Sequence, residues 1–183
     1  MSTDSGYITL KEVLSAKKKW SGWAVEFGVF SGESLGLISK HMPVIGFDSF
    51  QGLPEDWRPE FPNGAFAIPE GPTVADILKT GPNRMVVSGW FEDTVPGFPF
   101  PKLDLVHIDC DLYSSTVTSL EGVTPYVGPG TYVVFDEYHG YAGCEDHEEK
   151  AWTEWCKKNK VAHSTVAVGP EERAFLIESI KTR

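Results

Sequence analysis

Residues 23–41 read WAVEFGVFSGESLGLISKH, and this stretch decides the fold class of the chain. The run Trp23 to Phe27 is β-prone, Gly28 to Gly32 is a turn bounded by glycines, and Glu33 to His41 repeats apolar residues at helical spacing. A strand that passes through a glycine turn into a helix is typical of α/β proteins, in which helices cover a parallel sheet. The stretch therefore predicts the start of an α/β fold.

The rest of the chain repeats this alternation of strand and helix. We expect further strands at Val44 to Phe47, Met85 to Val87, Leu103 to Ile108, Thr131 to Phe135, Val161 to Val168 and Arg173 to Ile180. We expect further helices at Thr9 to Lys19, Ser114 to Leu120 and Asp146 to Lys158. In the first of these helices, Thr9 and Glu12 have the spacing of a capping box. The last two strands are separated only by residues 169–172, which predicts a C-terminal antiparallel hairpin after a mostly parallel sheet.

Length and composition limit the classes of protein that this chain can belong to. Its 183 residues, 41% of them hydrophobic, are enough for one core, so we expect a single domain over residues 1–183. The 26 acidic and 16 basic residues give a net charge of −10, which argues against nucleic acid or an anionic membrane as a partner. The N-terminus lacks the apolar run of a secretory signal, and the three cysteines share no CxxC spacing. We therefore expect a cytoplasmic protein with free thiols.

Two segments outside the sheet have their own expected roles. Residues 1–20 should contain the N-terminal helix. Residues 49–72 hold five prolines together with Trp57, Phe61 and Phe66, which is too much proline for regular structure. Long loops in compact domains commonly serve function, so this segment is a candidate lid.

The glycine turn and the acid that follows it indicate a nucleoside-containing cofactor. Gly28 and Gly32 let the backbone approach a ligand closely, and Asp48 lies 22 residues after Glu26, near the spacing of an acid that binds ribose. Phe30 stands where a dinucleotide-binding turn would have its second glycine. This difference favours S-adenosylmethionine over a pyrophosphate cofactor. A purely structural role for the two glycines is an alternative with about the same weight as cofactor binding.

Four carboxylates follow two strands that should be neighbours. They are Asp109, Asp111, Asp136 and Glu137. Carboxylates held this close repel one another, and a hard cation such as Mg²⁺ would compensate their charge. Capping of the following helix could explain Asp111, but it does not explain all four residues.

Five blocks of the sequence resemble the macrocin O-methyltransferase family. They are EFGVFSG at 26–32, GFDSFQGLPE at 46–55, GWFEDT at 89–94, HIDCDLYSST at 107–116 and DEY at 136–138. The family consists of class I enzymes that use S-adenosylmethionine and Mg²⁺ to methylate sugar hydroxyls of natural-product glycosides. The resemblance implies a single-domain class I methyltransferase (Rossmann-like) fold with a mostly parallel, seven-stranded sheet.

The resemblance also implies roles for individual residues. Glu26, Gly28 and Gly32 would shape the methionine end of the cofactor site, Asp48 would hold the ribose, and residues 88–91 would border the adenine. The full set expected to contact the cofactor is Glu26, Gly28, Phe30, Gly32, Ser34, Asp48, Ser49, Ser88, Gly89, Trp90, Phe91 and Asp109.

Metal and proton-transfer roles follow from the same resemblance. Asp109, Asp136 and Glu137 would be metal ligands, although the family commonly has a second aspartate where this chain has Glu137. Asp111 would be the catalytic base. Independently of the resemblance, the position of His139 two residues after Glu137 makes it an alternative base or acceptor contact, with a plain loop histidine as the equal alternative. For the other candidate side chains, we expect His107 to be a hydrogen-bonded core histidine and Trp57 and Trp90 to contact ligand.

The predicted function is metal-dependent methyl transfer from S-adenosylmethionine to a hydroxyl of a sugar or glycoside. One alternative is a catalytically silent module that binds S-adenosylmethionine or carbohydrate. Another is a metal-dependent hydrolase that uses the same carboxylates. A homodimer is a further hypothesis for the assembly of the chain.

Overall fold

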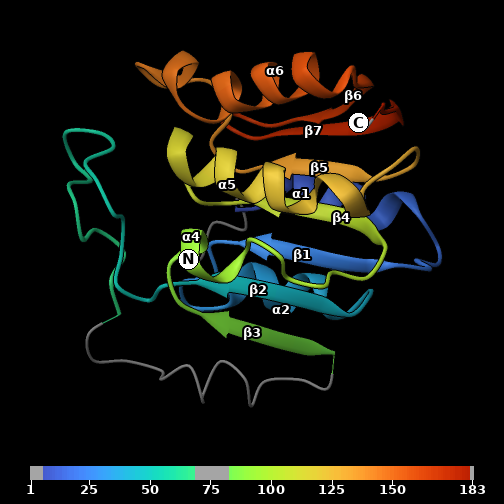
Figure 1. The fold of residues 1–183 in the computed structure, drawn as a ribbon, viewed down its shortest axis with the longest axis horizontal. Coiled ribbons are helices and arrows are strands. Elements are labelled where there is room, and N and C mark those ends of the chain that lie inside the picture. Colours follow the sequence, from blue (N-terminus) through green and yellow to red (C-terminus); the bar gives the residue numbers. More distant parts are fainter. Residues whose placement is uncertain (1–5, 69–82, 182–183) are drawn as a thin grey trace.

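The computed structural model describes residues 6–68 and 83–181, which form one sheet covered by helices (Figure 1). The strands are β1 Trp23–Phe27, β2 Val44–Asp48, β3 Arg84–Ser88, β4 Leu103–Ile108, β5 Tyr132–Phe135, β6 Ala162–Val168 and β7 Arg173–Ser179. They form a seven-stranded sheet in the order β3-β2-β1-β4-β5-β7-β6. Strands β1 to β5 are parallel, whereas β7 is antiparallel to both β5 and β6. The predicted mostly parallel sheet with a C-terminal hairpin is therefore confirmed.

Helices cover both faces of the sheet. They are α1 Ile8–Ala16, α2 Glu33–Ile38, α4 Phe91–Thr94, α5 Tyr113–Val123 and α6 Glu148–Asn159, with short 3-10 turns at Thr124–Tyr126 and Cys144–Asp146. In Figure 1, α4, α5 and α6 lie in front of the sheet and α1 and α2 lie behind it. Alternate strand residues supply the two cores, as Ala24 packs with α1 and α2 while Val25 packs with α5 and α6. This arrangement explains why the central strands are buried along almost their whole length.

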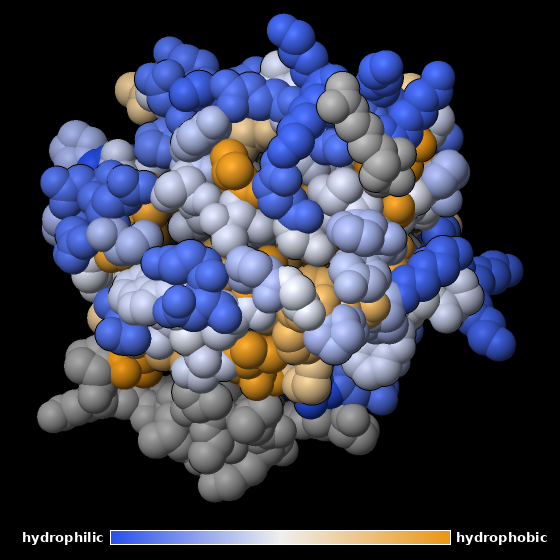
Figure 2. All heavy atoms as spheres, in the orientation of Figure 1, coloured by the Kyte–Doolittle hydropathy of each residue, from blue (hydrophilic) through white to orange (hydrophobic). Residues whose placement is uncertain are grey.

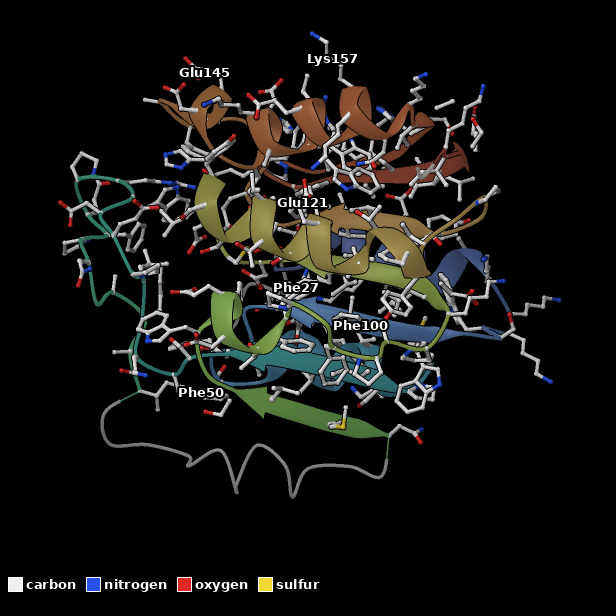
Figure 3. All side chains as sticks on the ribbon, in the orientation of Figure 1. Phe27, Phe50, Phe100, Glu121, Glu145 and Lys157 are labelled. Carbon is white, nitrogen blue, oxygen red and sulfur yellow. The ribbon has the colours of Figure 1, made fainter. Side chains whose placement is uncertain are left out.

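The side chains on the front face show how the core is separated from solvent. Phe27 and Phe100 point into the interior with their ring centroids 6.5 Å apart, whereas Glu145 and Lys157 project outward (Figure 3). The outer surface of α6 is predominantly hydrophilic (Figure 2). None of the helices within residues 6–68 and 83–181 has the length and hydrophobicity needed to cross a membrane. The three cysteines are free thiols, as expected.

The N-terminal helix differs from its prediction at both ends. It starts at Ile8, and its N-cap is Tyr7 in a left-handed conformation (φ 61°, ψ 43°) without a side-chain cap, so the predicted capping box of Thr9 and Glu12 is wrong. The buried Glu172, from the turn between β6 and β7, accepts a hydrogen bond from the Ile8 amide at 2.7 Å instead. The helix ends at Ala16, because Lys17 is already extended (φ −119°, ψ 131°). A distant residue thus supplies the cap that local sequence was expected to supply.

The segment after β2 lacks helix and strand as far as it is described. Residues 49–68 contain turns and an isolated β-bridge between Arg58 and Phe61. This agrees with the prediction from its proline content. The remainder of the expected loop, residues 69–72, lies outside the described residues.

Strand register brings the functional segments to one edge of the sheet. Phe27 is paired with Phe47 on one side and with Ile108 on the other, and Ile108 is paired with Phe135. The residues that follow these strands therefore meet at the carboxyl ends of the parallel strands, where α/β proteins bind ligands.

Candidate active site

A pocket of about 270 Å³ opens at this edge of the sheet. The predicted cofactor residues that line it are Gly28, Phe30, Asp48, Ser49, Trp90, Phe91 and Asp109. Asp111, Asp136 and Glu137 line the same pocket, so the two predicted clusters share one cavity. The other predicted cofactor residues, which do not line it, are Glu26, Gly32, Ser34, Ser88 and Gly89.

The glycine turn is held against the strand next to it. Gly28 has φ +91°, and a Cβ atom added there would lie 1.7 Å from the carbonyl oxygen of Asp109. Only glycine fits at this position, because both the backbone conformation and the available space exclude a side chain. The close contact of β1 with β4 therefore depends on this residue.

Asp48 organises the loops around the pocket. Its Oδ2 accepts hydrogen bonds from the amides of Val29 and Phe30 at 2.7 and 2.8 Å, and its Oδ1 accepts one from the amide of Phe50 at 2.7 Å. Phe30 and Phe50 are both left-handed, with φ of 46° and 57°, and these bonds help to hold that strained backbone. A carboxylate has about four acceptor positions, so Oδ1 still has room for a ligand hydroxyl. The role of Asp48 in binding ribose stays a prediction.

The four predicted carboxylates meet as expected from the strand register. Oxygens of Asp109, Asp111 and Glu137 all lie within 4.8 Å of one another. Burial, followed by the neighbouring carboxylates, raises the pKa of Asp109 and of Glu137 well above the usual range. The Oε2 atom of Glu137 is buried without a hydrogen-bond partner among the described residues. This concentration of negative charge makes the cluster a strong candidate for binding a cation.

A fifth carboxylate, Glu148, belongs to this cluster and is not predicted from the sequence. It is the first residue of α6 and is fully buried. Burial and then the charge of Asp111 raise its pKa well above the usual range, while the backbone amides of Asp111 and Glu137 lower it. In the sequence it is part of the acidic run at 145–149, which looks like a solvated helix start. Nothing in the neighbouring sequence indicates that one acid of that run is buried.

The two candidate bases differ in their position. Asp111 is buried, lines the pocket and has φ 65°. Burial raises its pKa to about 7, against the opposing effects of a Glu137 hydrogen bond and the Arg58 charge. The Nε2 atom of His139 lies 3.3 Å from the carbonyl oxygen of Glu172, and His139 does not line the pocket. Asp111 is therefore the better placed of the two.

The segment at 49–68 is docked beside the pocket through Arg58. The guanidinium lies 3.9 Å from the ring centroid of Trp57 and 3.6 Å from that of Tyr141. It also forms a salt bridge of 2.7 Å with Glu171. Trp57 thus packs within the protein and does not line the pocket, whereas Trp90, the other tryptophan expected to contact ligand, does.

Comparison with known proteins identifies the family of this chain. Residues 78–169, half of the chain, match the family described as macrocin-O-methyltransferase (TylF). The chain belongs to this family. The family resemblance predicted from the five sequence blocks is thereby confirmed.

Two curated relatives of this macrocin O-methyltransferase family member come from Streptomyces species. It is 35% identical over 138 residues to 8-demethyl-8-(2,3-dimethoxy-alpha-L-rhamnosyl)-tetracenomycin-C 4'-O-methyltransferase of Streptomyces olivaceus, covering 64% of this chain and 53% of that protein. It is 41% identical over 150 residues to demethyldecarbamoylnovobiocin O-methyltransferase of Streptomyces niveus, covering 68% of this chain and 56% of that protein. The chain thus spans about half the length of these relatives.

Solved structures establish the fold class. The O-methyltransferase NovP superposes with a TM-score of 0.68 at 24% identity, covering 89% of this chain and 73% of that one. The calicheamicin methyltransferase CalS11 superposes with a TM-score of 0.66, also at 24% identity, covering 91% and 75% of the two chains. The chain has the class I methyltransferase fold that the sequence predicted.

Proposed function

We propose that this protein transfers a methyl group from S-adenosylmethionine to a hydroxyl of a sugar or glycoside, with Mg²⁺ bound at the carboxylate cluster. One observation carries the proposal, namely that the glycine turn, Asp48 and Trp90 line the same pocket as the carboxylates. A cofactor at the first set of residues and a hydroxyl at the second would therefore be neighbours. The curated relatives, both named as O-methyltransferases, support this chemistry.

The carboxylate cluster fits Mg²⁺ by its chemistry. Asp109, Asp136 and Glu137 would hold the ion, because their oxygens are the hard ligands that Mg²⁺ prefers. The partnerless, buried Oε2 of Glu137 and the raised pKa values of the cluster are consistent with a missing positive charge. When bound, Mg²⁺ supplies a Lewis acid that lowers the pKa of a nearby hydroxyl.

The other half of the pocket fits S-adenosylmethionine. Gly28 leaves the backbone accessible, Trp90 and Phe91 offer aromatic surface for an adenine ring, and Asp48 has acceptor capacity for a hydroxyl. When bound, the cofactor supplies a methyl group that is ready for transfer to a nucleophile.

The side chains that face the reacting hydroxyl would divide the work between them. Asp111 would take the proton of the acceptor hydroxyl onto a carboxylate oxygen, for which its place in the pocket and its raised pKa are suited. Leu53 and Phe66, which also line the pocket, would exclude water and help to orient the acceptor. Positioning of acceptor and donor in one cavity would supply much of the remaining acceleration.

The test combines binding and turnover on the parent chain. Calorimetric titration with S-adenosylhomocysteine, with and without Mg²⁺, measures cofactor binding, and labelled S-adenosylmethionine measures methyl transfer to a panel of glycosides. Cofactor binding without transfer to any glycoside would favour the binding-module alternative. Loss of an acceptor group without any cofactor requirement would favour the hydrolase.

Replacement of Asp111 by Asn tests the base directly. The amide keeps the shape of the side chain but removes its basicity, so single-turnover methyl transfer should fall by about 10² to 10⁴. Affinity for S-adenosylhomocysteine should change little. His139→Gln is the matched variant, and a larger loss of turnover there than in Asp111→Asn would assign the base to the histidine.

A further inference from the structure

His107 has one ring nitrogen in a hydrogen bond and the other without a partner. Its side chain is fully buried on β4, and Nδ1 lies 2.9 Å from Oε1 of Glu26, which is itself fully buried on β1. The Nε2 atom has no hydrogen-bond partner among the described residues. Leaving such a nitrogen unpaired inside a protein is costly, so its environment needs an explanation.

The free nitrogen faces two of the strand-end carboxylates. Nε2 of His107 and oxygens of Asp109 and Asp136 all lie within 4.8 Å of one another. If Nδ1 donates its proton to Glu26, Nε2 presents a lone pair to two groups that are also electron donors. A cation between three Lewis bases that converge in this way would stabilise the arrangement.

We propose that His107, Asp109 and Asp136 form a binding site for a first-row transition-metal dication. This site shares Asp109 and Asp136 with the all-oxygen site proposed for Mg²⁺, and it differs from that site in taking the imidazole of His107 in place of Glu137. Imidazole is a ligand for transition metals, whereas Mg²⁺ prefers oxygen ligands and retains water. Bonds of about 2.1 Å place ligand atoms roughly 3 to 4 Å apart, so small side-chain rotations would close the site.

Glu26 would act as a positioning residue for this site. A metal-binding histidine commonly donates its second ring proton to a carboxylate, which fixes the tautomer and the ring orientation. The pair of Glu26 and His107 has this arrangement at 2.9 Å. Tyr7 closes the site from the α1 side, as its ring packs edge-on against His107 with centroids 6.2 Å apart.

A nitrogen-sensitive measurement on the full chain tests the proposal independently of methyl transfer. The apo protein is titrated with Mn²⁺ alone, and pulsed electron paramagnetic resonance records coupling of the bound ion to nitrogen. Protein labelled with [¹⁵N]histidine should show the corresponding change in that coupling. Absence of nitrogen coupling in the parent chain would overturn the proposal, and this outcome requires no variant that might fail to fold.

Variants then locate the nitrogen. His107→Gln should abolish the nitrogen coupling and lower the affinity for Mn²⁺ by about tenfold or more. Glu26→Gln should lower the affinity for Mn²⁺ by about 10- to 100-fold. His41→Gln removes an exposed histidine and should retain the full signal. Coupling that persists in His107→Gln would show that another histidine binds the ion.

Glu137→Gln separates this proposal from the Mg²⁺ site. Glu137 belongs to the all-oxygen group and not to the group that contains His107. The variant should therefore bind Mg²⁺ with lower affinity but keep the nitrogen coupling of bound Mn²⁺. Loss of that coupling in Glu137→Gln would mean that there is one mixed site instead of two.

Discussion

Gly28 is the residue on which the contact between β1 and β4 depends. Ala at this position would combine a left-handed conformation with a Cβ atom 1.7 Å from a backbone oxygen, and neither strand can move independently of the sheet. We expect Gly28→Ala to lower the free energy of unfolding by roughly 3 kcal/mol or more. Urea denaturation measures this change.

Gly64 provides the matched control for this substitution. It also has positive φ (+81°), but no atom lies within 4 Å of an added Cβ. Gly64→Ala should therefore cost only about 1 kcal/mol, which is the effect of conformation alone. Equal losses in the two variants would show that the close contact at Gly28 is relieved by movement.

The cysteines should differ in their reactivity toward thiol reagents. Burial raises the pKa of Cys110 well above its usual range and that of Cys156 to about 12, so neither side chain supplies the reactive thiolate near neutral pH. Cys144 is only partly buried. Ellman's reagent should therefore modify one thiol per native chain rapidly and three after denaturation, and Cys144→Ser should remove the rapid phase. Rapid modification of two thiols in the native protein would contradict the buried positions.

The site residues differ in whether their roles can be predicted from the sequence. Acids that directly follow strands, such as Asp109 and Asp136, can be predicted because parallel register brings strand ends together. The internal bonds of Asp48 to the amides of two loops cannot be predicted, since they depend on how those loops turn. Glu148 is equally hidden, because its burial is decided by the docking of α6. The strand-end part of the site is thus encoded locally, and its packing partners are not.

At the scale of elements, strands are predicted more closely than helix ends. The bounds of β1 and β4 agree with the expected runs, because each strand is a mostly apolar, buried segment that ends at a glycine turn or an acid. The start of α1 does not agree, because its cap comes from Glu172, which is 164 residues away from Ile8. Local capping rules cannot include such a partner.

Arg58 should control how firmly the segment at 49–68 is docked. Its guanidinium contacts two aromatic rings and Glu171, and Arg58→Ala would remove all three contacts. We expect hydrogen exchange of amides in residues 53–68 to become about tenfold faster, since a partly desolvated cation–π contact contributes about 1 to 2 kcal/mol.

A surface variant controls for the general loss of a charge pair. Lys158 and Glu121 form an ion pair whose side chains are 63% and 47% exposed, far from this segment in the sequence. Lys158→Ala should leave exchange in residues 53–68 unchanged, because exposed pairs contribute little. Unchanged exchange in Arg58→Ala itself would mean that the other contacts of the segment are sufficient to hold it.

Over the whole molecule, acidic residues have two roles, one at the surface and one in the pocket. Most of the 26 acids keep the surface negative, but the strand-end acids and Glu148 are gathered where the fold withdraws them from water. Composition predicts only the first role, and the topology of the sheet produces the second. A charge of −10 therefore reflects both the surface of the protein and the chemistry of the pocket.

The pH dependence of stability should contain a measurable contribution from His163. Its ring packs against Trp152 and Phe175, with centroids 5.2 and 4.8 Å away, and although the residue is exposed, this partial desolvation lowers its pKa despite the opposing charge of Glu178. Because the folded state then binds fewer protons than the unfolded state, the stability that His163 contributes is lost as the pH falls through the unfolded pKa, about 6.5. His163→Gln should therefore lose less stability than the parent between pH 7.5 and pH 5, as measured by urea denaturation at each pH. A parent curve parallel to that of His163→Gln would show that protonation of this ring does not oppose folding.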